Sequence, residues 1–394
     1  MKLTSVLTTV SLVGLVTAHA GPAPLTWKRD NLEARDTLER RCGSALAHKR
    51  AKRAEEAMNT VLARRGLEGS DVKIHPKRSA NQDSTCLVTP EVTQGPYHVL
   101  GEIVRQNMTE GQAGVALEIS VDFIDINNCG PLSNYWIDMW QCNGTGQYAH
   151  YASSTVGTGG GGESGGTPPS GSGGAGSGFP STSEVATSTL GPYSGADDPA
   201  AGAFLNTTME DNETFLRAVY PTDENGRLTA YTIVPGWYSG RAVHFHIKVY
   251  PEGYIAENGT FVANSSAQHT GQFFFDADTM DAVRQVDPYT SNTISWEDAV
   301  ANEDDQWYPY QSATGYDAEM AITWVGDSLE DGLIGSITVA VNTSYTSPEL
   351  STQYSSFNVS EYLEEGLLPF ASTSALEGGE TGALRPWPSQ MTTS

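Results

Sequence analysis

The chain has 394 residues, of which 38% are hydrophobic and 18% charged, which is enough apolar material for a real core. Its net charge of −25 is unevenly spread: residues 1–80 carry 15 Lys+Arg against 8 Asp+Glu (net +7), and residues 81–394 carry 7 against 39 (net −32). A body this acidic repels phosphate backbones, so the charge argues against nucleic acid as a partner.

The first twenty residues have the layout of a secretory signal peptide. Lys2 supplies a positive start, Val6–Val16 a short and mostly apolar run, and Ala18-His19-Ala20 the small residues of a cleavage site. The apolar run is too short to span a bilayer, and no later stretch is long and apolar enough. The polar C-terminus argues against a lipid anchor. We therefore expect a secreted, extracellular protein without a membrane anchor.

Sequons and cysteines both fit an extracellular protein. In an oxidising compartment, four cysteines predict two disulfides, with three connectivities open. The sequons accept N-linked glycans in secreted chains. The cysteines and the sequons together predict a disulfide-bonded glycoprotein. The cysteines are Cys42, Cys86, Cys129 and Cys142, and the sequons are Asn107, Asn143, Asn206, Asn212, Asn258, Asn264, Asn342 and Asn358.

Residues 21–80 form a basic segment with helical character. Asn31–Arg35 and Ala51–Arg65 contain neither Pro nor Gly and carry apolar residues at helical spacing. Dibasic pairs such as Lys28-Arg29 look like processing sites, which would make the segment a propeptide. The alternative is a permanent helical arm, and Cys42 favours it because a disulfide could tie the arm to the body.

From Cys86 onward the sequence is typical of a β-rich domain. Short runs rich in Val, Ile, Phe, Tyr and Thr alternate with Gly, Asn, Asp and Pro turns, a pattern of strands and loops. We therefore expect a mainly β fold, with a β-sandwich core over residues 81–345, a helical N-terminal arm and long loops. The expected strands are Val115–Ile126, Tyr135–Cys142, Leu228–Val234, Val243–Tyr250 and Ser336–Val341.

Two segments depart from this strand pattern. Residues 152–182 are rich in Gly, Ser and Thr, cannot bury enough apolar surface to order themselves, and predict a flexible insertion within the domain. Residues 346–394 look like a polar C-terminal tail, with a short helix near Val359–Leu367.

The segment Pro235–His246 is the most informative for chemistry. A strand directs residues i and i+2 to one face, so His244 and His246 are expected side by side, where two imidazoles can chelate one metal ion. Just upstream, Gly236 permits a sharp bend that would present Tyr238. The alternative is a pair of half-exposed histidines on a polar sheet face. Tyr148 follows a strand in a Gly-containing loop, a usual place for site residues, although an ordinary packing role is also open.

Five segments together resemble the intradiol ring-cleavage dioxygenase family, most closely its secreted fungal branch. The resemblance covers roughly residues 80–345, with the motifs in the family's order. The matching segments are Thr89–Tyr97, Asp138–Tyr148, Thr214–Arg217 with Thr222-Asp223, Pro235–His246 and Gly271–Asp276.

The resemblance implies a mononuclear non-haem iron(III) centre. Carried over from the matching segments, its ligands would be Tyr148, Tyr238, His244 and His246. Phenolate is a hard anionic donor that stabilises iron(III) over iron(II), so these residue types suit the ion. The implied enzyme uses O2 to open a catechol-type aromatic diol between its two hydroxyl-bearing carbons, giving a muconate-type diacid. Which catechol it takes and its oligomeric state stay open, with a homodimer as one option.

The resemblance also implies catalytic roles around the metal. Tyr238 would accept a substrate proton, Arg241 would stabilise negative charge on the substrate ring, and Gln272 would lie near the substrate. A structural salt bridge for Arg241 and simple strand hydrogen bonding for Gln272 are the alternatives. Trp140 and Trp237 flank the proposed ligands. One role for them is to line an aromatic pocket, but we expect both to be packing residues.

Two other functions compete with the dioxygenase. One is a secreted glycoprotein that binds a partner through the same sandwich with an inactive metal site, because a fold does not determine function. The other is a copper or zinc hydrolase built on His244 and His246, which lacks a third ligand at convincing spacing. Phe245 replaces the family's usual aliphatic residue, but it should point to the opposite face of the strand.

Overall fold

The computed structural model describes residues 59, 63, 75–76, 89–155, 208–305, 307–312 and 316–371. The predicted signal peptide, nearly all of the basic arm and most of the Gly/Ser-rich insertion lie outside these residues. None of the described helices is long and apolar enough to cross a membrane.

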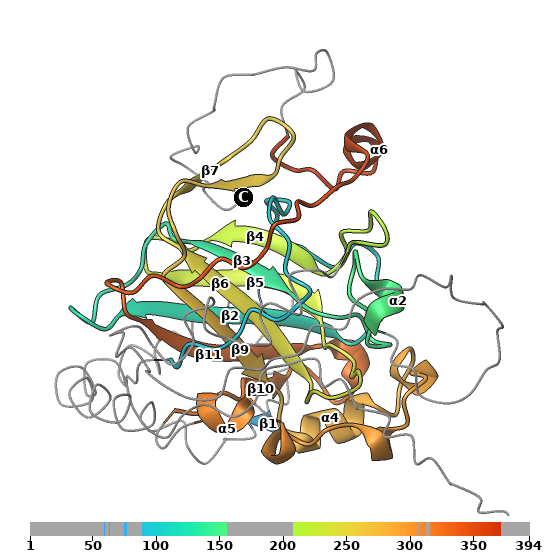
Figure 1. The fold of residues 1–394 in the computed structure, drawn as a ribbon. Helices are drawn as coiled ribbons and strands as arrows, with labels where there is room; N and C mark the ends of the chain where they lie inside the picture. Colours follow the sequence, from blue (N-terminus) through green and yellow to red (C-terminus); the bar gives the residue numbers. More distant parts are fainter. Residues whose placement is uncertain are drawn as a thin grey trace, which may run out of the picture.

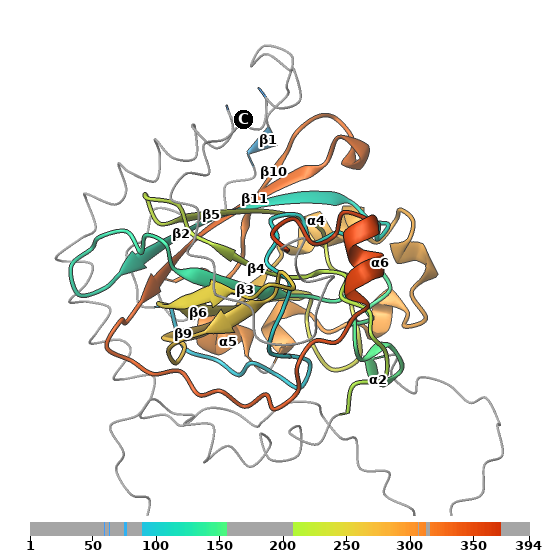
Figure 2. The ribbon, with the colours of Figure 1, turned by 90° about the horizontal axis from the view of Figure 1, so that it is seen from above.

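Two stacked β-sheets form the body, as Figures 1 and 2 show. The first sheet has the order β1-β10-β11-β2-β5 and the second β4-β3-β6-β9; within them only β11 and β2 pair in parallel. The strands are β1 (His75–Pro76), β2 (Ala116–Asp125), β3 (Trp136–Trp140), β4 (Arg217–Pro221), β5 (Arg227–Ile233), β6 (His244–Tyr250), β9 (His269–Phe274), β10 (Ala321–Trp324) and β11 (Leu333–Val341), with a separate hairpin of β7 (Gly253–Ile255) and β8 (Phe261–Ala263). The mainly β prediction is confirmed, and the five predicted strands correspond to β2, β3, β5, β6 and β11.

Helices are short and lie in the connections between strands, except for the last one, which follows β11. They are α2 (Ala152–Thr155), α4 (Ala277–Val283), α5 (Tyr308–Gln311), α6 (Val359–Glu364) and the 3-10 turns η1 (Tyr289–Ser291), η2 (Trp296–Asp298), η3 (Asn302–Asp304) and η4 (Leu329–Asp331). The helix predicted near Val359 is therefore present as α6. It begins with Asn358, whose side chain accepts hydrogen bonds from the first free backbone N–H groups and so caps the helix.

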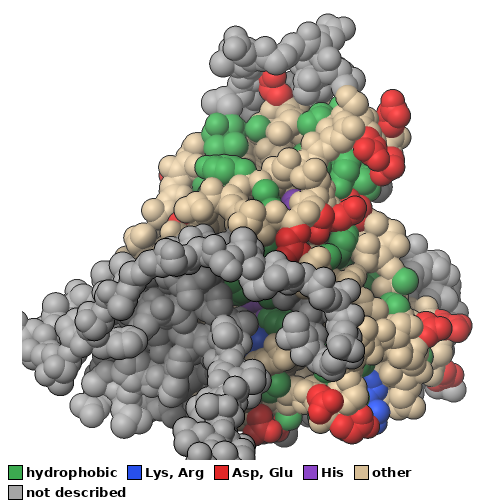
Figure 3. Space-filling model, turned by 45° about the vertical axis from the view of Figure 1, so that its right-hand side comes forward, with side chains coloured by type: hydrophobic (Ala, Val, Ile, Leu, Met, Phe, Trp, Pro, Cys, Tyr) green, Lys and Arg blue, Asp and Glu red, His purple; other side chains and the backbone are tan. Residues whose placement is uncertain are grey.

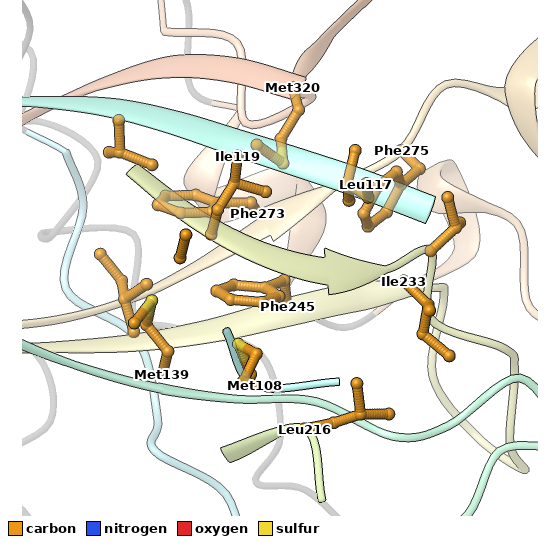
Figure 4. Close-up of a cluster of buried hydrophobic side chains, with 14 of the residues drawn as sticks. Met108, Leu117, Ile119, Met139, Leu216, Ile233, Phe245, Phe273, Phe275 and Met320 are labelled. Atoms are coloured by element: carbon orange, nitrogen blue, oxygen red, sulfur yellow. The ribbon is translucent and has the colours of Figure 1, made fainter. Parts of the chain in front are cut away.

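Successive side chains of β6 point alternately to a hydrophobic face and to a polar face of the strand. Phe245, Ile247 and Val249 are fully buried in the main core between the sheets. The ring of Phe245 lies parallel to that of Phe273 with 6.0 Å between centroids, below Ile119 of the facing sheet (Figure 4). Burial of each such side chain stabilises the fold by about 1.5–3 kcal/mol. The predicted direction of Phe245 is confirmed, and the histidines project from the other face.

The outer face of the second sheet is covered by the two ends of the described body. Leu100 forms a parallel bridge with Tyr354, and Ser351 Oγ donates to the carbonyl of His98 over 2.7 Å. Glu349 pairs with Lys248 of β6 at 3.1 Å. Residues 346–371 therefore pack on the sheet and belong to the folded body, although the sequence predicts a polar tail from residue 346.

Most basic side chains of the described body lie in its interior. Four of its six Lys and Arg residues are buried, and each of them pairs with a carboxylate. The face shown in Figure 3 accordingly displays many acidic side chains and few basic ones. The buried cations and their partners are Arg105 with Glu110, Arg217 with Glu102, Arg241 with Asp305, and Lys248 with Glu349.

The prediction of two disulfides is wrong. Cys129 is disulfide-bonded, but Cys142 carries a free thiol. Cys142 lies just after β3, only 1% exposed, among packed aromatic rings, and its Sγ donates to the carbonyl of Gly236 over 3.4 Å. Burial raises the pKa of the Cys142 thiol to about 12, so it is an inert packing group rather than a reactive one.

Candidate metal centre

The two histidines of β6 are arranged as ligands of one ion. Their Nε2 atoms lie 2.9 Å apart, and both side chains are 1% exposed. The Nδ1 of His244 lies 2.6 Å from the carbonyl oxygen of Ala242, which assigns the proton to Nδ1 and a lone pair to Nε2. Two nitrogens bound at right angles to one ion, each at 2.0–2.1 Å, would lie about 2.9 Å apart. The strand therefore presents a bidentate pair, as its spacing predicts.

Both predicted tyrosines converge on this pair from separate turns. The Oη of Tyr238 lies 3.3 Å from the Nε2 of His244. The ring of Tyr148 lies edge-on to Tyr238 at 5.7 Å and to His246 at 6.2 Å. All four side chains are buried. The structure thus brings together the four residues that the sequence singles out.

The chemistry of these side chains fits a hard, highly charged ion. Burial, reinforced by Arg241, lowers the pKa of His244 to about 3, so its imidazole is neutral and able to bind a metal at neutral pH. Burial raises the pKa of both Tyr148 and Tyr238 well above the usual value, so iron(III) would have to displace two phenol protons on binding. Within the described ranges no group of three or more His, Cys, Asp or Glu side chains is arranged to hold a metal ion, so a site here would depend on the two phenols.

Interlocked backbones hold the two tyrosine-bearing turns against each other. Gly146 has φ +85°, and a Cβ there would lie 2.2 Å from the carbonyl oxygen of Trp237. A Cβ on Gly236 would lie 2.3 Å from the carbonyl oxygen of Gly144, and Gly236 N donates to the carbonyl of Asn143 over 3.0 Å. Only glycine allows backbones to approach this closely, so these positions determine how far apart the two phenols lie.

We predict that Gly146→Ala destabilises the protein by about 3–4 kcal/mol, because the left-handed backbone and the contact with Trp237 both oppose a side chain. Gly240→Ala is the matched control, since Gly240 has the same φ of +85° but no atom within 4 Å of the added Cβ. It should cost only about 1–2 kcal/mol. Chemical denaturation of both variants measures the difference, and equal losses would show that the contact between the turns is unimportant.

Arg241 and Gln272 form a buried hydrogen-bonded group beside the histidines. Arg241 Nη1 lies 3.4 Å from the Nε2 of His244, and Arg241 Nη2 donates to Gln272 Oε1 over 2.5 Å. The Nε2 of Gln272 donates in turn to the carbonyl of Thr93 over 3.0 Å. Burial by itself would lower the pKa of Arg241, but the carboxylate of Asp305 outweighs it and raises that pKa. Arg241 is therefore both part of a buried ion pair and a positive charge at the centre.

Solved structures similar to this chain are intradiol ring-cleavage dioxygenases. One from Tetranychus urticae is 25% identical, with a TM-score of 0.46 over 68% of this chain and 99% of that chain. Catechol 1,2-dioxygenase from Pseudomonas arvilla C-1 is 15% identical, with a TM-score of 0.35 over 84% of this chain and 81% of its own. Hydroxyquinol 1,2-dioxygenase from Pseudomonas putida DLL-E4 is 14% identical, with 0.32 over 67% and 68%. No protein-family model and no curated protein matches the chain.

Aromatic rings pack around the candidate ligands. Trp140 stacks on His246 with 4.8 Å between centroids and 7° between planes. Tyr97 stacks on Tyr148 at 4.8 Å and lies edge-on to Tyr238 at 6.2 Å. These contacts restrict the rotation of the rings that would hold the metal. Trp140 is thus a buried packing residue, as expected, and it packs directly on a candidate ligand.

Sequence reasoning missed two residues of the site. Asp305 ends the acidic run Asn302–Asp305, which resembles an exposed charged loop, yet its side chain is 2% exposed and bonded to Arg241. Tyr97 lies in a motif that carried the family resemblance, but its contact with Tyr148 has no local signal. Only the packing of distant segments shows either role.

Proposed function

We propose that the chain is a non-haem iron(III) intradiol dioxygenase that opens the ring of a catechol-type diol between its two hydroxyl-bearing carbons. The observation that carries this proposal is the convergence of Tyr148, Tyr238, His244 and His246, all at most 4% exposed. Two phenols and two imidazoles without a carboxylate or thiolate favour iron(III) over the softer or divalent metals. Both oxygen atoms of O2 would enter the product, a cis,cis-muconate-type diacid.

Each residue of the candidate centre would have its own role in catalysis. Bound iron(III) would supply an acid centre for the two catechol oxygens and draw electron density from the ring, making it reactive towards O2. Tyr238 is the proposed proton acceptor, because a buried phenolate with a raised pKa is a strong base. Arg241 would stabilise negative charge on the bound diol through Nη1, which faces His244.

We also propose that the protein works outside the cell as a glycoprotein of the secreted fungal type. The signal-peptide pattern in residues 1–20 supports secretion. Sequon asparagines on the described surface also support it, since Asn107, Asn212, Asn264 and Asn358 are exposed. Expression with the native N-terminus tests this directly, because the medium should contain a chain that begins after Ala20 and loses mass on enzymatic deglycosylation. A chain retained inside the cells would contradict secretion.

The visible spectrum tests the proposed activity. The iron(III)-loaded protein should show a tyrosinate-to-iron(III) charge-transfer band that moves to longer wavelength when catechol is added without oxygen. Admission of O2 should then consume one O2 for each diacid formed. A protein that stays colourless after iron(III) loading and catechol addition would reject the dioxygenase and favour a glycoprotein binding module with an inactive site.

A further inference from the structure

Asp305 forms the base of the buried group beside the candidate metal centre. Its Oδ2 accepts hydrogen bonds from Arg241 Nε over 2.7 Å and from the backbone N of Ala242 over 2.9 Å. Its Oδ1 accepts from the backbone N of Trp307 over 2.7 Å, from the backbone N of Tyr308 over 3.0 Å and from Arg241 Nη2 over 3.3 Å. Each of these five partners is a donor, so the carboxylate is held from several directions.

A fixed carboxylate fixes the direction of the guanidinium. The guanidinium is a rigid plane with its N–H groups in a set geometry, so holding Nε and Nη2 also determines where Nη1 lies. Gln272 accepts from Nη2 as a second support, and its own anchor is the carbonyl of Thr93. Nη1 is then the edge that faces the proposed ligands, 3.4 Å from His244 Nε2.

We propose that Asp305 is a positioning residue that aims the Nη1 edge of Arg241 at the reacting diol. This inference rests on the proposed function and adds to it a residue from the loop of η3 and α5, distant in sequence from the four candidate ligands. With both oxygens occupied by five donors, Asp305 acts through Arg241 rather than on the substrate. If Asp305 had only a structural role, it would hold this loop to Ala242. Asp305→Asn would then have the same effect on kcat whether or not Arg241 is present.

A double-mutant cycle separates these two roles. We expect Asp305→Asn to lower kcat about 100-fold, the scale of losing one aligned donor at a charge-stabilising site. The Kd for catechol, measured without oxygen from the spectral shift, should change less than about 3-fold, because the charge of Arg241 matters most during the reaction. Arg241→Met should lower kcat at least as far. The double variant should be within about 3-fold of Arg241→Met alone, since no guanidinium remains to be aimed.

Two further variants keep the cycle interpretable. Asp122→Asn breaks another Arg–Asp ion pair, a partly exposed one with Arg227 at 3.0 Å in the first sheet, and should leave kcat within about 2-fold. If Asp305→Asn does not fold, Asp305→Glu replaces it, because that variant keeps the charge and displaces the carboxylate by one methylene. Iron content and thermal unfolding are recorded for each variant.

The outcomes distinguish the inference from the proposed function. The positioning role is overturned if the kcat losses of the two single variants multiply in the double variant, or if a folded Asp305 variant keeps full kcat. In either case an active wild type still upholds the dioxygenase. A wild-type chain that binds no iron(III), or that cleaves no catechol when loaded, overturns both.

Discussion

His246→Ala is expected to abolish iron(III) binding, from about one ion per chain to less than ~0.1, and to lower ring cleavage by at least about 1,000-fold. The side chain is buried with its Nε2 2.9 Å from that of His244, so its loss leaves a single imidazole to chelate the ion. It projects from the face of β6 opposite the main core, and for this reason the sandwich should still fold. Metal analysis and the visible spectrum of the purified variant measure the effect.

His269→Ala is the matched control for this experiment. His269 lies on β9 of the same sheet, is 3% exposed and has its Nδ1 3.0 Å from Glu91 Oε2, but it is not a candidate ligand. This variant should keep its iron(III) even if it unfolds at a lower temperature. Full iron content in the His246 variant would remove the ligand assignment on which the dioxygenase depends.

Tyr238→Phe is expected to lower kcat by about 100- to 1,000-fold, the usual range for losing a proton acceptor in the reaction. The phenyl ring would still pack against His244 and Tyr97, so the fold should persist. One of the two phenolate donors is gone, so the charge-transfer band should weaken and the iron(III) content should fall, and kcat is therefore expressed per bound iron(III). Steady-state kinetics and the visible spectrum test both parts.

Tyr250→Phe, on β6, controls for the loss of a buried tyrosine hydroxyl. Tyr250 projects from the same face of β6 as the histidines, and its Oη donates to Glu349 Oε2 over 2.8 Å. Both the band and kcat should be retained, because this hydroxyl is bonded to the covering segment rather than to the candidate centre. A Tyr238 variant that is as active as the Tyr250 variant would exclude Tyr238 as the proton acceptor.

The sequence alone determined the features that depend on local chain geometry. The alternation of β6 follows from the two-residue period of a strand, so Phe245 had to face the core once His244 and His246 faced away from it. Gly236 likewise marked the turn before the strand, because only glycine permits the close backbone approach found there. The mainly β architecture followed for the same reason, since strand and turn signals are read within a few residues.

Only the tertiary structure decided how residues far apart in the sequence meet at the centre. Tyr148 reaches the histidines because β3 pairs with β6 and the two glycine turns interlock. Asp305 belongs to the site because the loop of η3 and α5 folds back onto Arg241. Cys142 carries a free thiol and packs among aromatic rings. Residues 346–371 cover the sheet through pairings of the same long-range kind. These contacts join segments far apart in the chain, so they depend on sheet order and packing, which leave no local pattern in the sequence.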